Sequence, residues 1–361
     1  MSVRPAIGRC CAPAVLIVLT GCGTGSPGPP EREIVSHNHP YPTFGEVERL
    51  DPAIDVLIPP GTELEQLAAG FDWSEGPVWV SDGEYLLFSD IPPNSIYKWR
   101  EEDGTSLFMR PSGYDGPRTD IPEPGSNGLA LDHDGRLVLA EHGNRRIAKL
   151  ESLDDPNGPK TTIADRYDGR RLNSPNDVIV APGGDIYFTD PPYGLAGQLD
   201  DPEKELDFQG VYLLRRSGDA AGEVVLLDEQ TRPNGIALSP DGRALYTANS
   251  DPDLPVWYAF DVQDDGTVSN RRVFFDASHL MVEGRRGLPD GLKVDAAGNL
   301  WATGPGGVLV LSPDGRHLGT IMTGVPTANC AFGGDGSVLY ITADMYLARI
   351  QTASMGAAFV R

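Results

Sequence analysis

Six polar residues recur at the start of six similar segments of the chain. Each is a carboxylate or an amide followed by an apolar stretch, a turn containing glycine, and a second apolar stretch that ends in polar residues. The six residues are Glu75, Asn127, Asn176, Asn234, Asp290 and Asn329. Carboxylate and amide oxygens are the hard donors that Ca²⁺ and Mg²⁺ prefer in proteins. If the fold gathers these residues, we expect them to hold a divalent cation.

The two acids in this set strengthen the prediction of a metal site. Glu75 and Asp290 would repel one another across a narrow channel unless a cation lay between them. The set contains no thiol or imidazole, which disfavours a zinc site of the usual kind. We therefore predict Ca²⁺, with Mg²⁺ or Zn²⁺ as alternative cations. The competing interpretation is that Asn-Gly and Asp-Gly pairs simply form turns. It applies most readily to Asn127 and Asn329, which could also contact water or substrate.

The spacing of the six segments predicts the fold that positions these residues. The segments begin 39 to 58 residues apart, which is room for four short strands in each. Pairs such as Asp82-Gly83 and Asp134-Gly135 are typical of tight hairpin turns. No segment shows a long apolar period of 3.6 residues, so we expect little helix. Six four-stranded sheets in a radial arrangement make an all-β, six-bladed β-propeller with a central metal site.

In a propeller, the first strand of every blade lines the central channel. The six segment starts should therefore meet at one mouth. Each hairpin returns its second strand to the same rim, and the last residues of these strands should form a ring just outside the first. This outer ring includes Asp90, His142, Asp190 and Asn249.

The beginning of the chain predicts export. Arg4 and Arg9 precede a short apolar run over residues 12–19, and residues 19–22 read Leu-Thr-Gly-Cys. A basic start, a short apolar stretch and small residues describe a signal peptide. The last four residues resemble a bacterial lipobox, in which Cys22 receives lipid; a plain secretory signal is the alternative. We predict a lipoprotein signal peptide over 1–21, a tether over 22–45 and a propeller domain over 46–361. The mature protein would be periplasmic or on the cell surface, anchored in the membrane through Cys22.

Charge and cysteine content narrow the possible partners. The formal net charge of −23 argues against nucleic acid and against anionic lipid surfaces. Three of the four cysteines lie in the predicted leader, so the domain has no disulfide framework. We expect the remaining cysteine, Cys330, to be a small buried apolar residue. We also expect a small-molecule substrate and a monomeric protein.

Four motifs show a likeness to a known family. They are W-S-E-G-P-V-W at 73–79, S-P-N-D at 174–177, R-P-N-G at 232–235 and L-P-D-G at 288–291. Together they resemble the SMP-30/gluconolactonase/luciferin-regenerating-enzyme-like (LRE-like) family. Further segments, at 88–92, 141–146 and 188–194, are similar to bacterial gluconolactonases in particular. The likeness spans roughly Leu64 to Tyr346.

The resemblance implies a Ca²⁺-dependent lactonase, a hydrolase that opens a sugar lactone by metal-assisted attack of water. It implies that Glu75, Asn176, Asn234 and Asp290 are metal ligands. It also implies that Asp290 is the catalytic acid and base. One departure is Ser174, because some animal members carry an arginine there that holds the sugar. Recognition of sugar acids by that route is therefore not expected.

Around the predicted metal ligands, we assign substrate-binding roles to Asn127, His142, Asp190 and Tyr193. His142 and Asp190 could relay protons in place of Asp290, although His142 could equally be a rim histidine that holds its loop. Tyr193 could shape the pocket or only pack there. No G-x-S-x-G motif supports a nucleophilic serine.

Two alternative functions stay open. The same cation could take part in the hydrolysis of other esters or organophosphates. Alternatively, the protein could be a non-catalytic binding propeller in which calcium only stabilises the fold. Replacing Asp290 with asparagine would abolish turnover in an enzyme and leave a binding scaffold functional.

Overall fold

The computed structural model describes residues 33–216, 218, 221–281 and 285–360. The predicted signal peptide 1–21, Cys22 and residues 23–32 of the predicted tether 22–45 lie outside the described residues. No helix among the described residues is long and apolar enough to cross a membrane.

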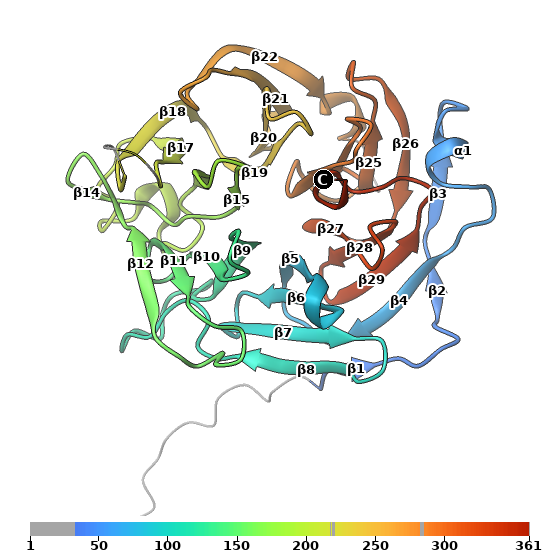
Figure 1. Cartoon of the computed structure of the whole chain (residues 1–361), viewed down its shortest axis with the longest axis horizontal. Helices are drawn as coiled ribbons and strands as arrows, with labels where there is room; N and C mark the ends of the chain where they lie inside the picture. Colours follow the sequence, from blue (N-terminus) through green and yellow to red (C-terminus); the bar gives the residue numbers. More distant parts are fainter. Residues whose placement is uncertain (1–32, 217, 219–220, 282–284, 361) are drawn as a thin grey trace, which may run out of the picture. The chain divides into compact units, whose positions relative to one another are not determined.

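Six antiparallel sheets are arranged radially around a central axis (Figure 1), which confirms the prediction of an all-β, six-bladed propeller. The first blade contains β5 (Ser74–Val80), β6 (Tyr85–Asp90), β7 (Ser95–Arg100) and β8 (Gly104–Met109). The second contains β9 (Ser126–Leu131), β10 (Leu137–Glu141), β11 (Arg146–Leu150) and β12 (Lys160–Ala164). The third contains β15 (Val178–Val180), β16 (Ile186–Asp190), β17 (Gln209–Leu214) and β18 (Val224–Gln230). In each of these blades the strands follow one another in sequence order from the axis outward.

The fourth blade repeats this order with β19 (Pro233–Leu238), β20 (Ala244–Asp251), β21 (Leu254–Val262) and β22 (Val268–Asp276). The fifth contains β23 (Leu292–Val294), β24 (Leu300–Gly304), β25 (Gly307–Leu311) and β26 (His317–Met322), and the sixth begins with β27 (Asn329–Gly333), β28 (Val338–Ala343) and β29 (Tyr346–Gln351). A short hairpin of β13 (Arg166–Tyr167) and β14 (Arg170–Arg171) precedes the third blade. The one α-helix of the described residues is α1 (Ile54–Leu57), so the expectation of little helix is confirmed.

The N-terminal part of the described chain closes the ring. Strand β4 (Leu64–Ala69) pairs with β29 as the next strand of the sixth blade, with Leu64 opposite Ile350. Strand β3 (Glu46–Arg49) pairs with β26 and extends the fifth blade. Because strands from both ends of the chain share a sheet, backbone hydrogen bonds hold the sixth blade in place.

The folded domain begins earlier than the predicted boundary at residue 46. Strands β1 (Val35–Ser36) and β2 (Thr43–Phe44) lie in the segment predicted as a tether, and both pair with β4. The polar and proline-rich composition of this segment concealed two short edge strands.

Apolar side chains between neighbouring blades form the core. Trp79 of the first blade stacks on Tyr340 of the sixth, with ring centroids 5.4 Å apart. Trp301 of the fifth blade meets Phe332 of the sixth edge-on, at 5.5 Å. Cys330 is fully buried in the same cluster, as expected. This packing fixes the angle between blades and therefore the positions of the strand starts around the axis.

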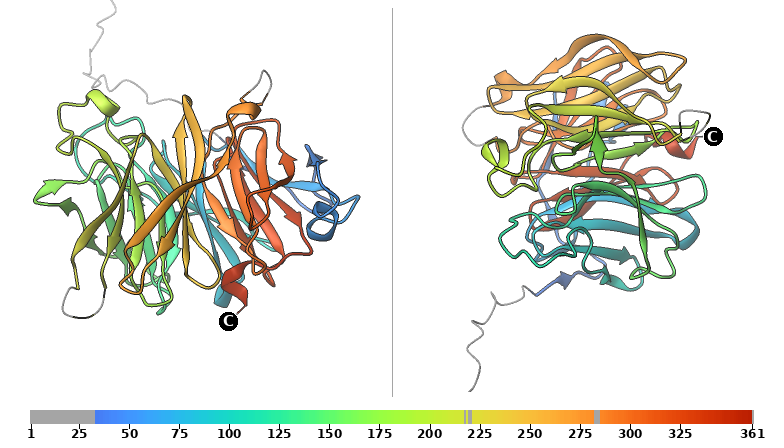
Figure 2. Two further views of the ribbon diagram at one scale, coloured as in Figure 1. Left: turned by 90° about the horizontal axis from the view of Figure 1, so that it is seen from above. Right: turned by 90° about the vertical axis from the view of Figure 1, so that its left-hand side faces the viewer.

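The two faces of the ring carry different connections (Figure 2). The 3₁₀-helix η2 (Gln198–Asp200) lies on one face, whereas η4 (Ala357–Phe359) lies on the opposite face. The remaining 3₁₀-helices are η1 (Ser81–Gly83) and η3 (Ser278–Leu280). The loop that contains η2 also carries Tyr193, which borders the central cavity described next.

Candidate active site

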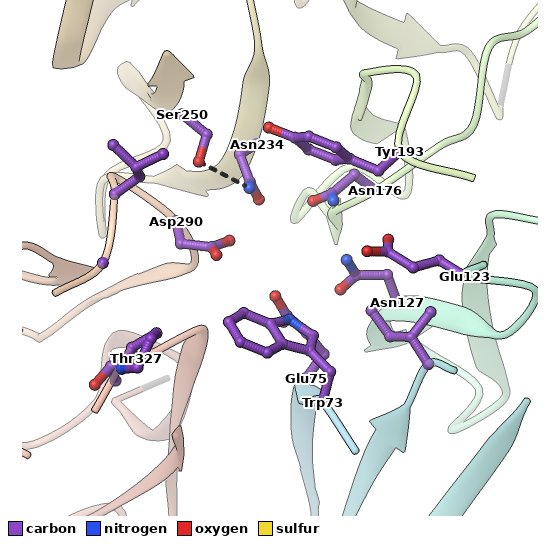
Figure 3. A pocket seen from close by; sticks show the side chains of 14 residues that line it. Trp73, Glu75, Glu123, Asn127, Asn176, Tyr193, Asn234, Ser250, Asp290 and Thr327 are labelled. Carbon is purple, nitrogen blue, oxygen red and sulfur yellow. Dashed lines mark hydrogen bonds between the residues drawn. The ribbon is translucent and has the colours of Figure 1, made fainter. Parts of the chain in front are cut away.

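The predicted convergence of the segment starts is observed. A cavity of about 350 Å³ lies at the centre of the ring, and five of the six predicted residues line it (Figure 3). Its lining residues are Trp73, Glu75, Ile91, Glu123, Asn127, Asn176, Tyr193, Asn234, Ser250, Gly287, Leu288, Asp290, Pro326 and Thr327. The sixth predicted residue, Asn329, does not line the cavity, but its amide donates a hydrogen bond to Glu75 Oε2 at 3.2 Å.

Glycine after the polar residue allows the strand starts to come so close. A Cβ on Gly235 would lie 2.2 Å from the carbonyl oxygen of Asp290, and a Cβ on Gly76 would lie 1.9 Å from that of Asn127. Such distances exclude any side chain at these positions. The polar-glycine pairs are therefore not only turn formers. In the four segments that have this glycine, it lets the strand start touch the start of the next blade.

The acids of the cavity are strongly perturbed by burial. Glu75 is nearly inaccessible, and burial raises its pKa to about 8 despite hydrogen bonds to Oε2 from the Gly76 backbone and from Asn329. Burial, followed by repulsion from Glu75, holds the pKa of Asp290 well above its usual value. Two carboxyl groups with raised pKa values in one cavity indicate a site that would bind a cation.

Several oxygens in this cavity have no hydrogen-bond partner. Asp290 Oδ1 and Asn127 Oδ1 are both buried and unpaired. An unpaired buried acceptor costs stability, so such atoms indicate a missing donor or cation. Among the described residues, no group of three or more His, Cys, Asp and Glu side chains could hold a metal ion. A divalent ion here would depend on two carboxylates together with amide oxygens, and this donor set suits Ca²⁺ or Mg²⁺.

The acids of the outer ring lie away from the cavity and bind backbone N–H groups. Asp190 does not line the cavity; its two carboxylate oxygens accept hydrogen bonds from the backbone N–H groups of Asn173 and Ser174, both at 2.7 Å. Asp90 accepts hydrogen bonds from Trp73 N at 2.8 Å and Asp72 N at 3.0 Å in the same way. These acids hold the loops that lead into the inner strands.

The other two predicted substrate-binding residues are Tyr193 and His142, and only Tyr193 lines the cavity. Tyr193 lines the cavity, and burial raises its pKa to about 12. His142 is fully buried behind the wall, with Nε2 3.5 Å from Asn176 Nδ2 and Nδ1 3.3 Å from Glu123 Oε2. The structure therefore brings Asn127 and Tyr193 to the cavity, and it places His142 and Asp190 one layer behind.

Sequence reasoning missed three charged residues near the axis. Asp177 is buried, and its oxygens accept hydrogen bonds from Val178 N and Ile236 N. It occupies a position that is glycine in four of the other five segments, and this difference could have identified it. Lys293 donates a hydrogen bond to Asn329 Oδ1 at 3.3 Å. Glu123 comes from an irregular segment outside the repeat, so no periodic signal pointed to it.

Comparison with known proteins places the chain in a family. Residues 73–344 match the sequence model described as "SMP-30/Gluconolactonase/LRE-like region". The chain belongs to this family. A gluconolactonase of Zymomonas mobilis is 36% identical over 357 residues, which cover 96% of this chain and 98% of that protein.

Two more distant family relatives agree with this assignment. A pentonolactonase of Haloferax volcanii is 29% identical, with 74% of this chain and 80% of that protein covered. The solved structure of a gluconolactonase from Xanthomonas campestris aligns with a TM-score of 0.72 and 30% identity, covering 89% of this chain and 99% of that one. The predicted family membership is therefore confirmed.

Proposed function

We propose that this protein is a gluconolactonase-type hydrolase that opens a sugar lactone with the help of one divalent cation. The observation that carries the proposal is the central cavity, in which the carboxylates of Glu75 and Asp290 lie together and in which Asp290 Oδ1 and Asn127 Oδ1 lack hydrogen-bond partners. The names of the relatives, gluconolactonase and pentonolactonase, support a cyclic ester of a sugar acid as the substrate.

Glu75, Asn176, Asn234 and Asp290 would hold the cation, which we propose to be Ca²⁺. The donor set fits, because all four side chains offer oxygen and all four line one cavity. A bound cation of this kind supplies a Lewis acid that polarises the ester carbonyl. Ser250 supports this arrangement, since Asn234 Nδ2 lies 3.4 Å from its hydroxyl and the amide oxygen is left for the cavity.

Asp290 is the residue that we assign to proton transfer. Its unpaired Oδ1 can accept a proton from the attacking water and return it to the ring oxygen when the ester bond breaks. The product is then the open hydroxy acid. The proton that Asp290 takes from the water is the one it donates to the ring oxygen, so the same carboxyl acts first as a base and then as an acid.

The cavity wall provides both polar and apolar contacts for a sugar ring. Asn127 and Tyr193 can contact the substrate directly, whereas Trp73, Ile91 and Leu288 offer apolar surface to its C–H face. We assign His142 and Asp190 to positioning, because both act through residues at the cavity edge.

We also propose that the protein is exported and anchored through a lipid on Cys22, and that it works as a monomer. The support for export and for the anchor is the sequence of residues 1–22 alone. Mass spectrometry of the membrane fraction would test the anchor: an N-terminal acylated Cys22 is expected, and an unmodified chain released after a signal peptide would contradict it.

The proposed activity is tested by removing and restoring the cation. Chelator-treated protein is mixed with D-glucono-δ-lactone near neutral pH, and acid release is followed with and without Ca²⁺, Mg²⁺ or Zn²⁺. Activity above the spontaneous rate that returns with a cation is expected, and Asp290→Asn should abolish it. A folded protein that binds Ca²⁺ but hydrolyses no lactone would contradict the proposal.

A further inference from the structure

Three carboxylates line the cavity, and the third belongs to neither predicted ring. No lysine, arginine or histidine lines this cavity in the described part of the chain. Two of the acids, Glu75 and Asp290, start inner strands. The third, Glu123, comes from the segment between β8 and β9, and its carboxylate points into the cavity (Figure 3).

The segment that carries Glu123 is closed at its base by backbone hydrogen bonds. Tyr114 N donates to the carbonyl of Pro124 at 2.8 Å, and Gly125 N donates to the carbonyl of Ile91 at 3.1 Å. Asn94 joins the first part of the segment, because its Nδ2 donates to the carbonyl of Tyr114 at 2.7 Å. Glu123 therefore projects from a fixed loop base.

His142 lies next to one oxygen of Glu123. Glu123 Oε2 lies 3.3 Å from His142 Nδ1, and the other ring nitrogen of this fully buried histidine lies 3.5 Å from Asn176 Nδ2. His142 Nδ1 makes no hydrogen bond to the described residues, so the two groups are in close contact and neither oxygen of Glu123 is held by the ring. Glu123 Oε1 accepts no hydrogen bond from any of the described residues, so it is available to a ligand in the cavity.

We propose that Glu123 selects the substrate, and that it favours neutral lactones with several hydroxyl groups over lactones that carry a negative charge. This inference rests on the proposed lactonase function and names a specificity residue within it. A lactone hydroxyl can donate a hydrogen bond to Oε1, and hydrogen bonds to charged acceptors are the stronger kind.

The charge of Glu123 opposes anionic substrates. A cation held by Glu75 and Asp290 would balance the charges of these two acids. Glu123 would then be the remaining uncompensated charge among the described lining residues. A phosphate or carboxylate on the substrate would lie in the same small cavity as this carboxylate, and the two negative charges would repel one another at short range.

The test compares three lactones with two variants of Glu123. The lactones are D-glucono-δ-lactone, δ-valerolactone, which has no hydroxyl group, and the 6-phosphate of the glucono lactone. Glu123→Gln keeps the shape and removes the charge, and Glu123→Lys reverses the charge. Asp115→Asn is the matched control, because Asp115 is an exposed acid in the same segment and does not line the cavity.

We expect kcat/KM for D-glucono-δ-lactone to fall about tenfold or more in Glu123→Gln, since a charged hydrogen bond is lost. The value for δ-valerolactone should change by less than about threefold, because this ring donates no hydrogen bond. Glu123→Lys should raise the ratio of kcat/KM for the phosphorylated lactone to that for the neutral one by about tenfold or more. Asp115→Asn should match the wild type with all three lactones.

A binding measurement complements the kinetics. The glucono-δ-lactam is not hydrolysed under these conditions, so calorimetry can report its affinity alone, and Glu123→Gln should weaken it by about the same factor. Equal losses with all three lactones, or unchanged lactam affinity, would overturn the role of Glu123 and leave the lactonase function intact. A wild type that hydrolyses none of the three would instead overturn the proposed function.

Discussion

The inner and outer rings of polar residues occupy equivalent places in the repeat, yet their hydrogen bonding differs. In the inner ring, Asp290 Oδ1 and Asn127 Oδ1 face the cavity without partners. In the outer ring, both oxygens of Asp190 are occupied by backbone N–H groups, and Asp90 is bonded in the same way. The residues of both rings are buried except Asp290, which is partly exposed.

This difference separates residues that are available for chemistry from those that support it. An acid whose oxygens already accept two backbone hydrogen bonds stabilises a loop, and it has little capacity left for a ligand. An acid with an unpaired oxygen costs stability in the isolated protein and gains when a cation or substrate arrives. The comparison assigns function to the inner ring and stability to the outer one.

The largest expected contrast is in activity. Asp290→Asn removes both a proposed ligand charge and the proton acceptor, so kcat should fall by about 10²–10⁴ or more. Asp190→Asn keeps the shape of the loop anchor, and kcat should fall by less than about tenfold. Initial rates of lactone hydrolysis with saturating Ca²⁺ test the pair. Comparable losses in both variants would break the distinction between the rings.

The loss of folding stability should be larger for a change in the outer ring than for a change in the inner ring. Asp190→Ala leaves the N–H groups of Asn173 and Ser174 buried without acceptors, and we expect it to lower the free energy of unfolding by about 2–5 kcal/mol. Asp290→Ala, measured without cations, should cost little or even stabilise the fold, because it removes a buried acid with an unpaired oxygen. Urea unfolding checks both. A cation-free Asp290→Ala protein that is less stable than Asp190→Ala would contradict this account.

The pH dependence of folding stability should also reveal the contribution of the outer-ring acids. Burial raises the pKa of Asp190 to about 7 and that of Asp90 to about 6, from a usual value of 3.8. The folded chain therefore binds these protons more tightly than the unfolded chain, so its stability is greatest at low pH. It should decline as the pH rises from about 4 to about 7. Melting temperatures of cation-free protein across this range should show a shallower decline in Asp190→Asn, and an unchanged slope would contradict the assignment.

The sequence predicted the architecture and the inner ring because both follow from one repeat. A polar residue before an apolar strand, at six regular places, specifies where each blade begins, and a closed ring of blades brings those places together. Asp290 and Glu75 could therefore be located from the repeat alone. The same pattern indicates which residues come near the axis, and it does not indicate which atoms are already hydrogen-bonded. Asp190 was expected at the substrate for that reason.

Two features of the structure could not be predicted from the repeat in the sequence. Glu123 reaches the cavity from an irregular segment whose path depends on contacts such as Tyr114 N to the Pro124 carbonyl. Strands β1 and β2 are two residues long and form only by pairing with β4, so their short and polar sequences carry no strand signal.

Titration of Ca²⁺ into chelator-treated protein, followed by calorimetry, tests the central claim most directly. The wild type and Asp190→Asn should each bind one ion per chain at the centre of the ring, and Asp290→Asn should bind it at least about a hundredfold more weakly or not at all. Absence of binding in the folded wild type, or equal binding in Asp290→Asn, would contradict the assignment of the inner ring as the metal site.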